Sequence, residues 1–227
     1  DNNNRDEWQQ GQITDGYLNG DIPHAGLLTD TMWLARYPST DTNRNRARAR
    51  WAYYFFLGVD IEATATRATD AAALMDTNNP TLNNSACTVC HIVMDPVAGA
   101  FQNFGDGGHY RDSWGGNESL PDSYKETNDY HQGDLWYRDM LAPGFNNKTM
   151  ASSNNDSSLR WLAYEMVADE RFATGAVKFW WPAVYGNELL VVPTETSDAD
   201  YDQKLAAYNS QQDLINRFAD GFRLGTA

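Results

Sequence analysis

Both cysteines of this chain lie in one short string, A-C-T-V-C-H, which occupies residues 86–91. The string is a C-x-x-C-H motif, the spacing that attaches a c-type haem through two thiols. In a short helical turn, Cys87 and Cys90 face the vinyl edges of one porphyrin, and the imidazole of His91 reaches the iron as its proximal ligand. These three residues therefore predict one covalent haem c, with His91 bound to the iron.

Two other chemistries of paired cysteines stay open. A zinc site needs four ligands, and the remaining histidines, His24, His109 and His131, show no finger-like spacing. A thioredoxin-like redox pair belongs to a strand–helix–strand setting, whereas no alternation of strands and helices surrounds the motif. The specificity of the motif favours the haem over the redox pair, and the redox pair over the metal site.

The composition is that of a strongly acidic globular protein. The 227 residues include 31 acidic and 17 basic side chains, a net charge of −14, and 41% are hydrophobic. This charge repels phosphate backbones and anionic lipid headgroups. No apolar run approaches the roughly 20 residues of a membrane-spanning helix. We therefore expect no nucleic-acid partner and no membrane span.

Apolar periodicity and capping residues predict a mostly α fold with long irregular loops. A short helix over Cys87–His91 is expected to stop near Pro96, and Gly58 and Ser197 are the expected C-cap and N-cap of their helices. Longer helices are predicted over residues 42–57, 64–75, 156–167, 169–185 and 198–223, and one short strand over 189–192.

Residues 99–148 are rich in Gly, Asn, Asp and aromatic side chains, and they form a stretch too long for an ordinary connection. We expect this stretch to wrap the far face of the haem. The chain is divided into a haem-binding region, residues 1–150, and a helical region, residues 151–227, packed on it; one continuous domain is the alternative. Because the chain begins with neither Met nor a leader, we expect a removed signal peptide or a section of a longer protein.

The sixth iron ligand decides between electron transfer and chemistry at an open iron. Met140, which precedes a Pro-Gly turn, is the favoured candidate, and it would make His91 and Met140 the two protein ligands of the iron. Met150, His109, His131 and an open or external site are the alternatives. Met94, only three residues after His91, is expected to be a packing residue.

Arginine occupies every second position from Arg44 to Arg50. This spacing points side chains around a helix, which is typical of a solvated surface. A buried haem propionate, however, needs a cation, so Arg48 or Arg50 is a candidate propionate ligand, and we select Arg48. Aspartates at positions 106, 112, 122, 129 and 134 could bind Ca²⁺, but they lack the EF-hand register and are better explained as turn residues.

Several segments resemble one protein family. They are H-A-G-L-L-T at residues 24–29, the Arg-rich segment 43–58, C-T-V-C-H-I-V-M-D-P at 87–96, F-Q-N-F at 101–104, residues 159–172 and F-W-W-P at 179–182. The chain resembles the large cytochrome-c-like proteins of uncharacterised function found in planctomycetes and marine proteobacteria. That resemblance implies a cytochrome-c-like helical core, haem c and a secreted, periplasmic or extracellular location in a longer multidomain protein. Many relatives carry a His-Arg pair before the first Cys, where this chain has N-N-P at 78–80, so the role of that His cannot be carried over.

Three functions fit these observations. The first is a monohaem electron-transfer domain that exchanges electrons with redox protein donors and acceptors, its acidic surface steering basic partners. The second is a catalytic haem in a larger oxidoreductase that acts on peroxide or a polymer, and the third is a structural or assembly module that carries haem. No acid–base pair, nucleophile or phosphate loop specifies a reaction, so we favour an electron carrier over a stand-alone enzyme and assign no catalytic residue.

Overall fold

The computed structural model describes residues 24–39, 43–63, 70–77, 80–105, 108, 110 and 141–224. The mostly α fold is confirmed within this part of the chain. Eight α-helices and three 3₁₀-helices account for most of it. The α-helices are α1 (Thr31–Arg36), α2 (Arg46–Leu57), α3 (Ala71–Leu74), α4 (Pro80–Asn83), α5 (Ser85–Ala100), α6 (Ser158–Ala168), α7 (Glu170–Tyr185) and α8 (Tyr201–Arg223).

The remaining elements are short. The 3₁₀-helices are η2 (Gly26–Thr29), η3 (Ile61–Ala63) and η5 (Ser152–Ser157), and strands β1 (Gly144–Phe145) and β2 (Lys148–Thr149) form an antiparallel hairpin. Two asparagines in the left-handed region, at φ 49° and 63°, make its turn. Asparagine tolerates this conformation, so N-N at 146–147 closes the hairpin tightly. No strand occurs at residues 189–192, where one was predicted; this exposed segment runs without regular structure.

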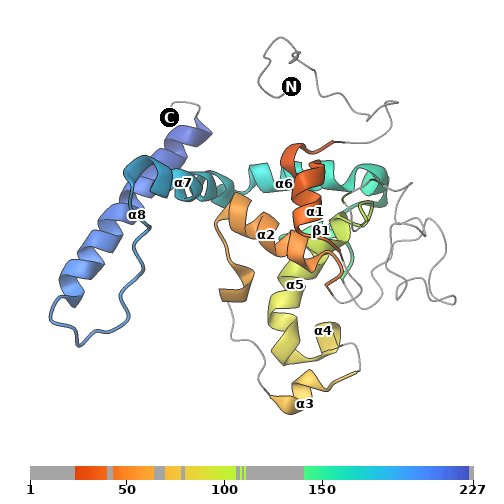
Figure 1. Ribbon diagram of the computed structural model, residues 1–227, viewed down its shortest axis with the longest axis horizontal. Helices are drawn as coiled ribbons and strands as arrows, with labels where there is room; N and C mark the ends of the chain where they lie inside the picture. Colours follow the sequence, from red (N-terminus) through yellow and green to blue (C-terminus); the bar gives the residue numbers. More distant parts are fainter. Residues whose placement is uncertain are drawn as a thin grey trace, which may run out of the picture.

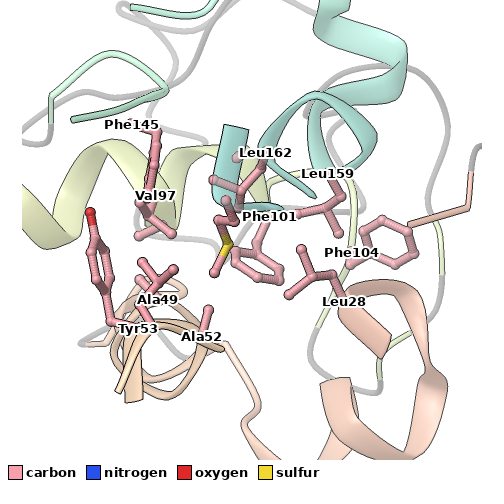
Figure 2. Packing of buried hydrophobic residues seen from close by; sticks show 14 of the residues in the cluster. Leu28, Ala49, Ala52, Tyr53, Val97, Phe101, Phe104, Phe145, Leu159 and Leu162 are labelled. Atoms are coloured by element: carbon pink, nitrogen blue, oxygen red, sulfur yellow. The ribbon is translucent and has the colours of Figure 1, made fainter. Parts of the chain in front are cut away.

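Helices α1, α2, α5 and α6 surround the hydrophobic core (Figure 1). Figure 2 shows Ala49, Ala52 and Tyr53 of α2 facing Val97 and Phe101 at the C-terminal end of α5. Small side chains on α2 let the two helices approach closely, because alanine adds little bulk at the contact. The core also includes Leu28, Leu34, Leu57, Ile61, Ala98, Ala100, Phe104, Phe145, Leu159, Leu162 and Met166.

This core joins residues from both predicted regions, since Leu159, Leu162 and Met166 of α6 pack in the same cluster as the side chains of α2 and α5. Ser158 also donates its hydroxyl to the carbonyl oxygen of Ala100 at 2.6 Å. The boundary at residue 150 therefore crosses a shared core. The division into two regions stays a prediction.

Helix α5 is much longer than predicted and continues through Pro96 to Ala100. Proline has no N–H and so removes one hydrogen bond within a helix, which is why a helix end was expected there. The next four residues are buried, and burial of Val97, Ala98 and Ala100 against α2 and α6 stabilises the last turn beyond the proline.

Helices α2, α6, α7 and α8 largely follow the predictions, whereas α1 and α4 were not predicted. Gly58 caps α2 in the left-handed conformation, at φ 64°, as expected. Asp169 caps α7, accepting a hydrogen bond from the backbone N–H of Arg171. Helix α8 begins at Tyr201, so its N-cap is Asp200 and Ser197 lies outside it. Of the helix predicted over 64–75, only Ala71–Leu74 is described as helical, and residues 64–69 lie outside the described part.

None of the helices in the described ranges combines the length and the apolar character that a bilayer crossing requires.

Candidate functional site

The C-x-x-C-H motif occupies the first two turns of α5, at the end of the helix that lies beside α3 and α4 (Figure 1). Asn84 begins the helix, its side-chain oxygen accepting a hydrogen bond from the N–H of Ala86 at 3.0 Å. The amide of Asn84 also donates to Asp76 at 3.0 Å, which ties the start of α5 to the preceding turn. This cap sets the register in which the following thiols are presented.

Cys87 and Cys90 are not joined in a disulfide, and each is partly exposed. They are three residues apart, so they lie about one helical turn apart along the same side of α5. His91 follows directly and shares that side with Cys87, because residues four apart in a helix are neighbours. Cys90 also packs against the core, with its sulfur 3.9 Å from the carbonyl oxygen of Ile61. Two thiols and an imidazole are the donor set of covalent haem attachment, and these side chains fit it.

A buried carboxylate stands behind the imidazole. His91 Nδ1 lies 2.9 Å from Oδ1 of Asp95, one turn further along α5. The Asp95 side chain is 0% exposed, and Arg46 of α2 pairs with it through two bonds, Nε to Oδ1 at 2.8 Å and Nη2 to Oδ2 at 3.0 Å. The sequence predicted a solvated surface position for Arg46 and no role for Asp95. The signal that could have found the His–Asp pair is their spacing of four in a helix.

Arg48 is fully buried, and all five of its N–H groups meet oxygen atoms. Nε donates to the carbonyl of Tyr37, one terminal nitrogen donates to Asn45 and Phe104, and the other donates to Leu34 and Gly105, at 2.6–3.1 Å. These bonds join α1, α2 and the turn after α5. They leave no N–H of Arg48 for a propionate, so a haem could use this residue only by displacing one of them. The expected solvated surface is wrong at this position.

The alternating arginines therefore divide between two sides of α2. Arg46 and Arg50 are four residues apart and face α5 and η3, whereas Arg48 faces α1. Arg50 pairs with Asp60 at 3.3 Å and with Glu62 at 2.9 Å, both partly exposed. The i, i+2 spacing does distribute the side chains around the helix, as predicted, but the protein covers both sides.

Most candidates for the sixth ligand lie outside the described residues, namely Met140, His109 and His131. Met150 is buried after β2, and its N–H donates to the carbonyl of Pro143. Pro143 touches α5 at Gly99, eight residues and about 12 Å along the helix axis beyond His91. The fold therefore places Met150 at the other end of α5 from the motif. Met94 packs against the core, as expected.

Two cavities lie away from the thiols. One, of about 680 Å³, is lined mostly by aromatic side chains of α1, α2 and α7, among them Trp33, Phe55 and Trp180, and by no residue of α5. A second, of about 330 Å³, opens on the side of α5 that carries Ile92 and Pro96, opposite the motif. Neither cavity is lined by the two thiols or the imidazole.

The electrostatics of the second cavity are set by Arg171, whose guanidinium lies over the ring of Tyr53. Burial raises the pKa of the Tyr53 hydroxyl to about 12. Hydrogen bonds from Arg171 lower the pKa of Asp169 to about 2. At neutral pH the Tyr53 phenol is therefore neutral, and the Asp169 carboxylate is ionised and paired with the Arg171 guanidinium. We assign this group of side chains a role in the stability of the fold.

No cluster of three or more His, Cys, Asp or Glu side chains suited to a metal ion occurs among the residues that were described. The aspartates considered for Ca²⁺, from Asp106 to Asp134, lie outside the described ranges.

Residues 24–114 match a family of planctomycete cytochrome-like domains. This family, PSCyt3, is described as a protein of unknown function (DUF1588). The matched range spans α1, α2 and α5, and so includes the motif and the Arg46–Asp95 pair, but it covers less than half of the chain. The comparisons with curated proteins and with solved structures found no match.

Proposed function

We propose that this chain is a monohaem c-type cytochrome domain that transfers electrons outside the cytoplasm. The observation that carries the proposal is the pair of thiols one helical turn apart in α5, followed directly by an imidazole that Asp95 holds at Nδ1. The cytochrome-like character of the family matched by residues 24–114 supports it. The periplasmic or extracellular location rests on the family resemblance described above.

Each residue of the motif has a distinct role in this proposal. Cys87 and Cys90 would hold the haem by thioether bonds, and Nε2 of His91 would bind the iron. The bound haem would supply reversible one-electron chemistry. Helix α5 fixes the spacing of the thiols, Asn84 fixes the start of that helix, and Asp95 fixes the imidazole. Met140 remains the proposed sixth ligand.

The surface charge determines which partners the domain would meet. At a net charge of −14, the domain attracts redox proteins with basic surfaces and repels acidic ones. Attraction of this kind raises association rates and weakens with ionic strength, since salt screens charges beyond about 10 Å at 0.1 M. We propose basic redox proteins as electron donors and acceptors.

The test is expression in a host that attaches c-type haem, followed by intact mass measurement and absorption spectroscopy. We expect one added haem per chain in the unaltered protein and loss of the covalent adduct in a Cys87→Ala, Cys90→Ala double variant. The Thr88→Ala variant, which changes the same turn of α5, is the matched control and should keep the adduct. An unmodified mass for the native protein would refute the proposal.

A reversible titration of one electron per haem would support electron transfer. A high-spin ferric spectrum that shifts on addition of cyanide or peroxide would instead support a catalytic haem with an open site. Met140→Ala tests the sixth ligand, because loss of an iron–sulfur bond should change both the spectrum and the potential.

A further inference from the structure

The contact between His91 and Asp95 affects the chemistry of the imidazole as well as its position. We propose that Asp95 is a positioning residue that fixes the tautomer of His91 and lowers the reduction potential of the iron it binds, and that Arg46 moderates this effect. The inference rests on the proposed function, since it concerns how the chain tunes the haem.

The hydrogen-bond geometry determines the tautomer. The Asp95 carboxylate receives two N–H groups from one guanidinium, through Nε and Nη2 of Arg46, which is the pairing of an ionised carboxylate. An ionised carboxylate only accepts hydrogen bonds. His91 Nδ1, 2.9 Å from Oδ1, must therefore be the donor, and in the neutral ring the lone pair then lies on Nε2. Nε2 is the nitrogen left to bind iron.

The surroundings make this contact strong. Asp95 is 0% exposed, Arg46 is 13% exposed and His91 is 20% exposed at the side chain. Water screens charges less at this buried position than at the surface. The Asp95 carboxylate therefore polarises the imidazole more than a solvated carboxylate would. A more electron-rich imidazole is a more basic ligand and stabilises the ferric over the ferrous state.

Arg46 acts on the same carboxylate in the opposite sense. Its Nε shares Oδ1 with His91, so the guanidinium draws electron density from the oxygen that the imidazole uses. Removing Asp95 and removing Arg46 should therefore shift the potential in opposite directions. If the two substitutions acted only by disturbing the contact between α2 and α5, both would disturb the same contact. Opposite shifts of the reduction potential would then not be expected.

The experiment measures the midpoint potential of the haem-loaded protein by spectroelectrochemistry in three variants. Asp95→Asn keeps the shape and an acceptor oxygen but removes the charge, and we expect at least a tenfold shift toward the reduced form, a rise of 59 mV or more for one electron. Arg46→Gln should lower the potential. Asp60→Asn is the control: it weakens the neighbouring Arg50 pair without touching His91 and should shift the potential much less.

Potentials unchanged in Asp95→Asn, or shifted in the same direction in both variants, would overturn the inference. If the Asp95→Asn variant does not hold haem, the Arg46→Gln variant alone tests the inference: a lower reduction potential supports it, and an unchanged or higher one overturns it. Absence of haem from the unaltered protein would overturn the proposed function and this inference with it, whereas haem with an insensitive potential would overturn this inference alone.

Discussion

At the residue scale, Arg48 shows that a charged side chain selected as a cofactor ligand from the sequence can instead serve the fold. Its guanidinium is enclosed by backbone carbonyls of two segments, the end of α1 and the turn after α5, and by the amide oxygen of Asn45. A planar fork of five donors suits such a set of fixed acceptors, whereas the three donors of a lysine cannot reach all of them. The residue therefore links α1 to the turn after α5.

Arg48→Lys should lower the free energy of unfolding by about 3 kcal/mol, because buried carbonyls lose their donors. Arg50→Lys, two residues along the same helix, should cost about 0.5 kcal/mol or less, since its pairs are partly exposed. Urea unfolding followed by circular dichroism measures both. Equal losses in the two variants would contradict the structural role assigned to Arg48.

At the element scale, α7 crosses α2 at a point where backbone meets backbone. A Cβ at Gly175 would lie 2.7 Å from the carbonyl oxygen of Phe56 and 2.9 Å from the N of Gly58. Backbone atoms cannot move aside as a flexible side chain can. Helix propensity alone disfavours a glycine in the middle of α7. The close approach of the end of α2 explains why Gly175 is there.

Gly175→Ala should lower the free energy of unfolding by about 2 kcal/mol, even though alanine favours the helix. Gly186→Ala is the matched control: Gly186 caps the same helix at φ 69° and a Cβ there meets no atom within 4 Å. It should cost only the backbone strain of about 1 kcal/mol. The comparison fails if Gly175→Ala is the milder of the two.

At the scale of the whole molecule, α8 packs on the outer part of α7, away from the helices that surround the core (Figure 1). Its buried apolar side chains are Ile215 and Ala219, and aromatic contacts such as Phe172–Phe222 and Tyr185–Phe218 complete the contact. No α8 residue belongs to the described core cluster. The attachment of α8 should therefore be separable from the folding of the rest.

Ile215→Asp should release α8 and increase proteolytic cleavage between residues 187 and 200 by about tenfold or more, because local opening governs cleavage there. The spectrum and potential of a bound haem should not change. Asn216→Asp adds the same charge at an exposed neighbour and should leave cleavage unchanged. Global unfolding of Ile215→Asp would show that α8 and the core are one cooperative unit.

The motif and the long helices were predictable from the sequence, because each depends on residues that are close along the chain. Cys87, Cys90 and His91 fall within five positions, and Gly58 and Asp169 act within a turn of the helices they cap. The end of α5 was not predictable in this way. Local chemistry favours a stop at Pro96, and burial against α2 and α6 outweighs it.

The environment of the imidazole combines both kinds of information. Asp95 is four residues from His91, a spacing that α5 turns into a contact, but Arg46 comes from 49 positions earlier. Likewise, the acceptors of Arg48 lie up to 57 positions away. The sequence alone determined which groups could form a haem site and the approximate positions of α2, α6, α7 and α8. Only the tertiary structure decided that Arg46 pairs with the carboxylate behind His91 and that Arg48 donates its N–H groups to backbone carbonyls. Both outcomes depend on how separate helices pack.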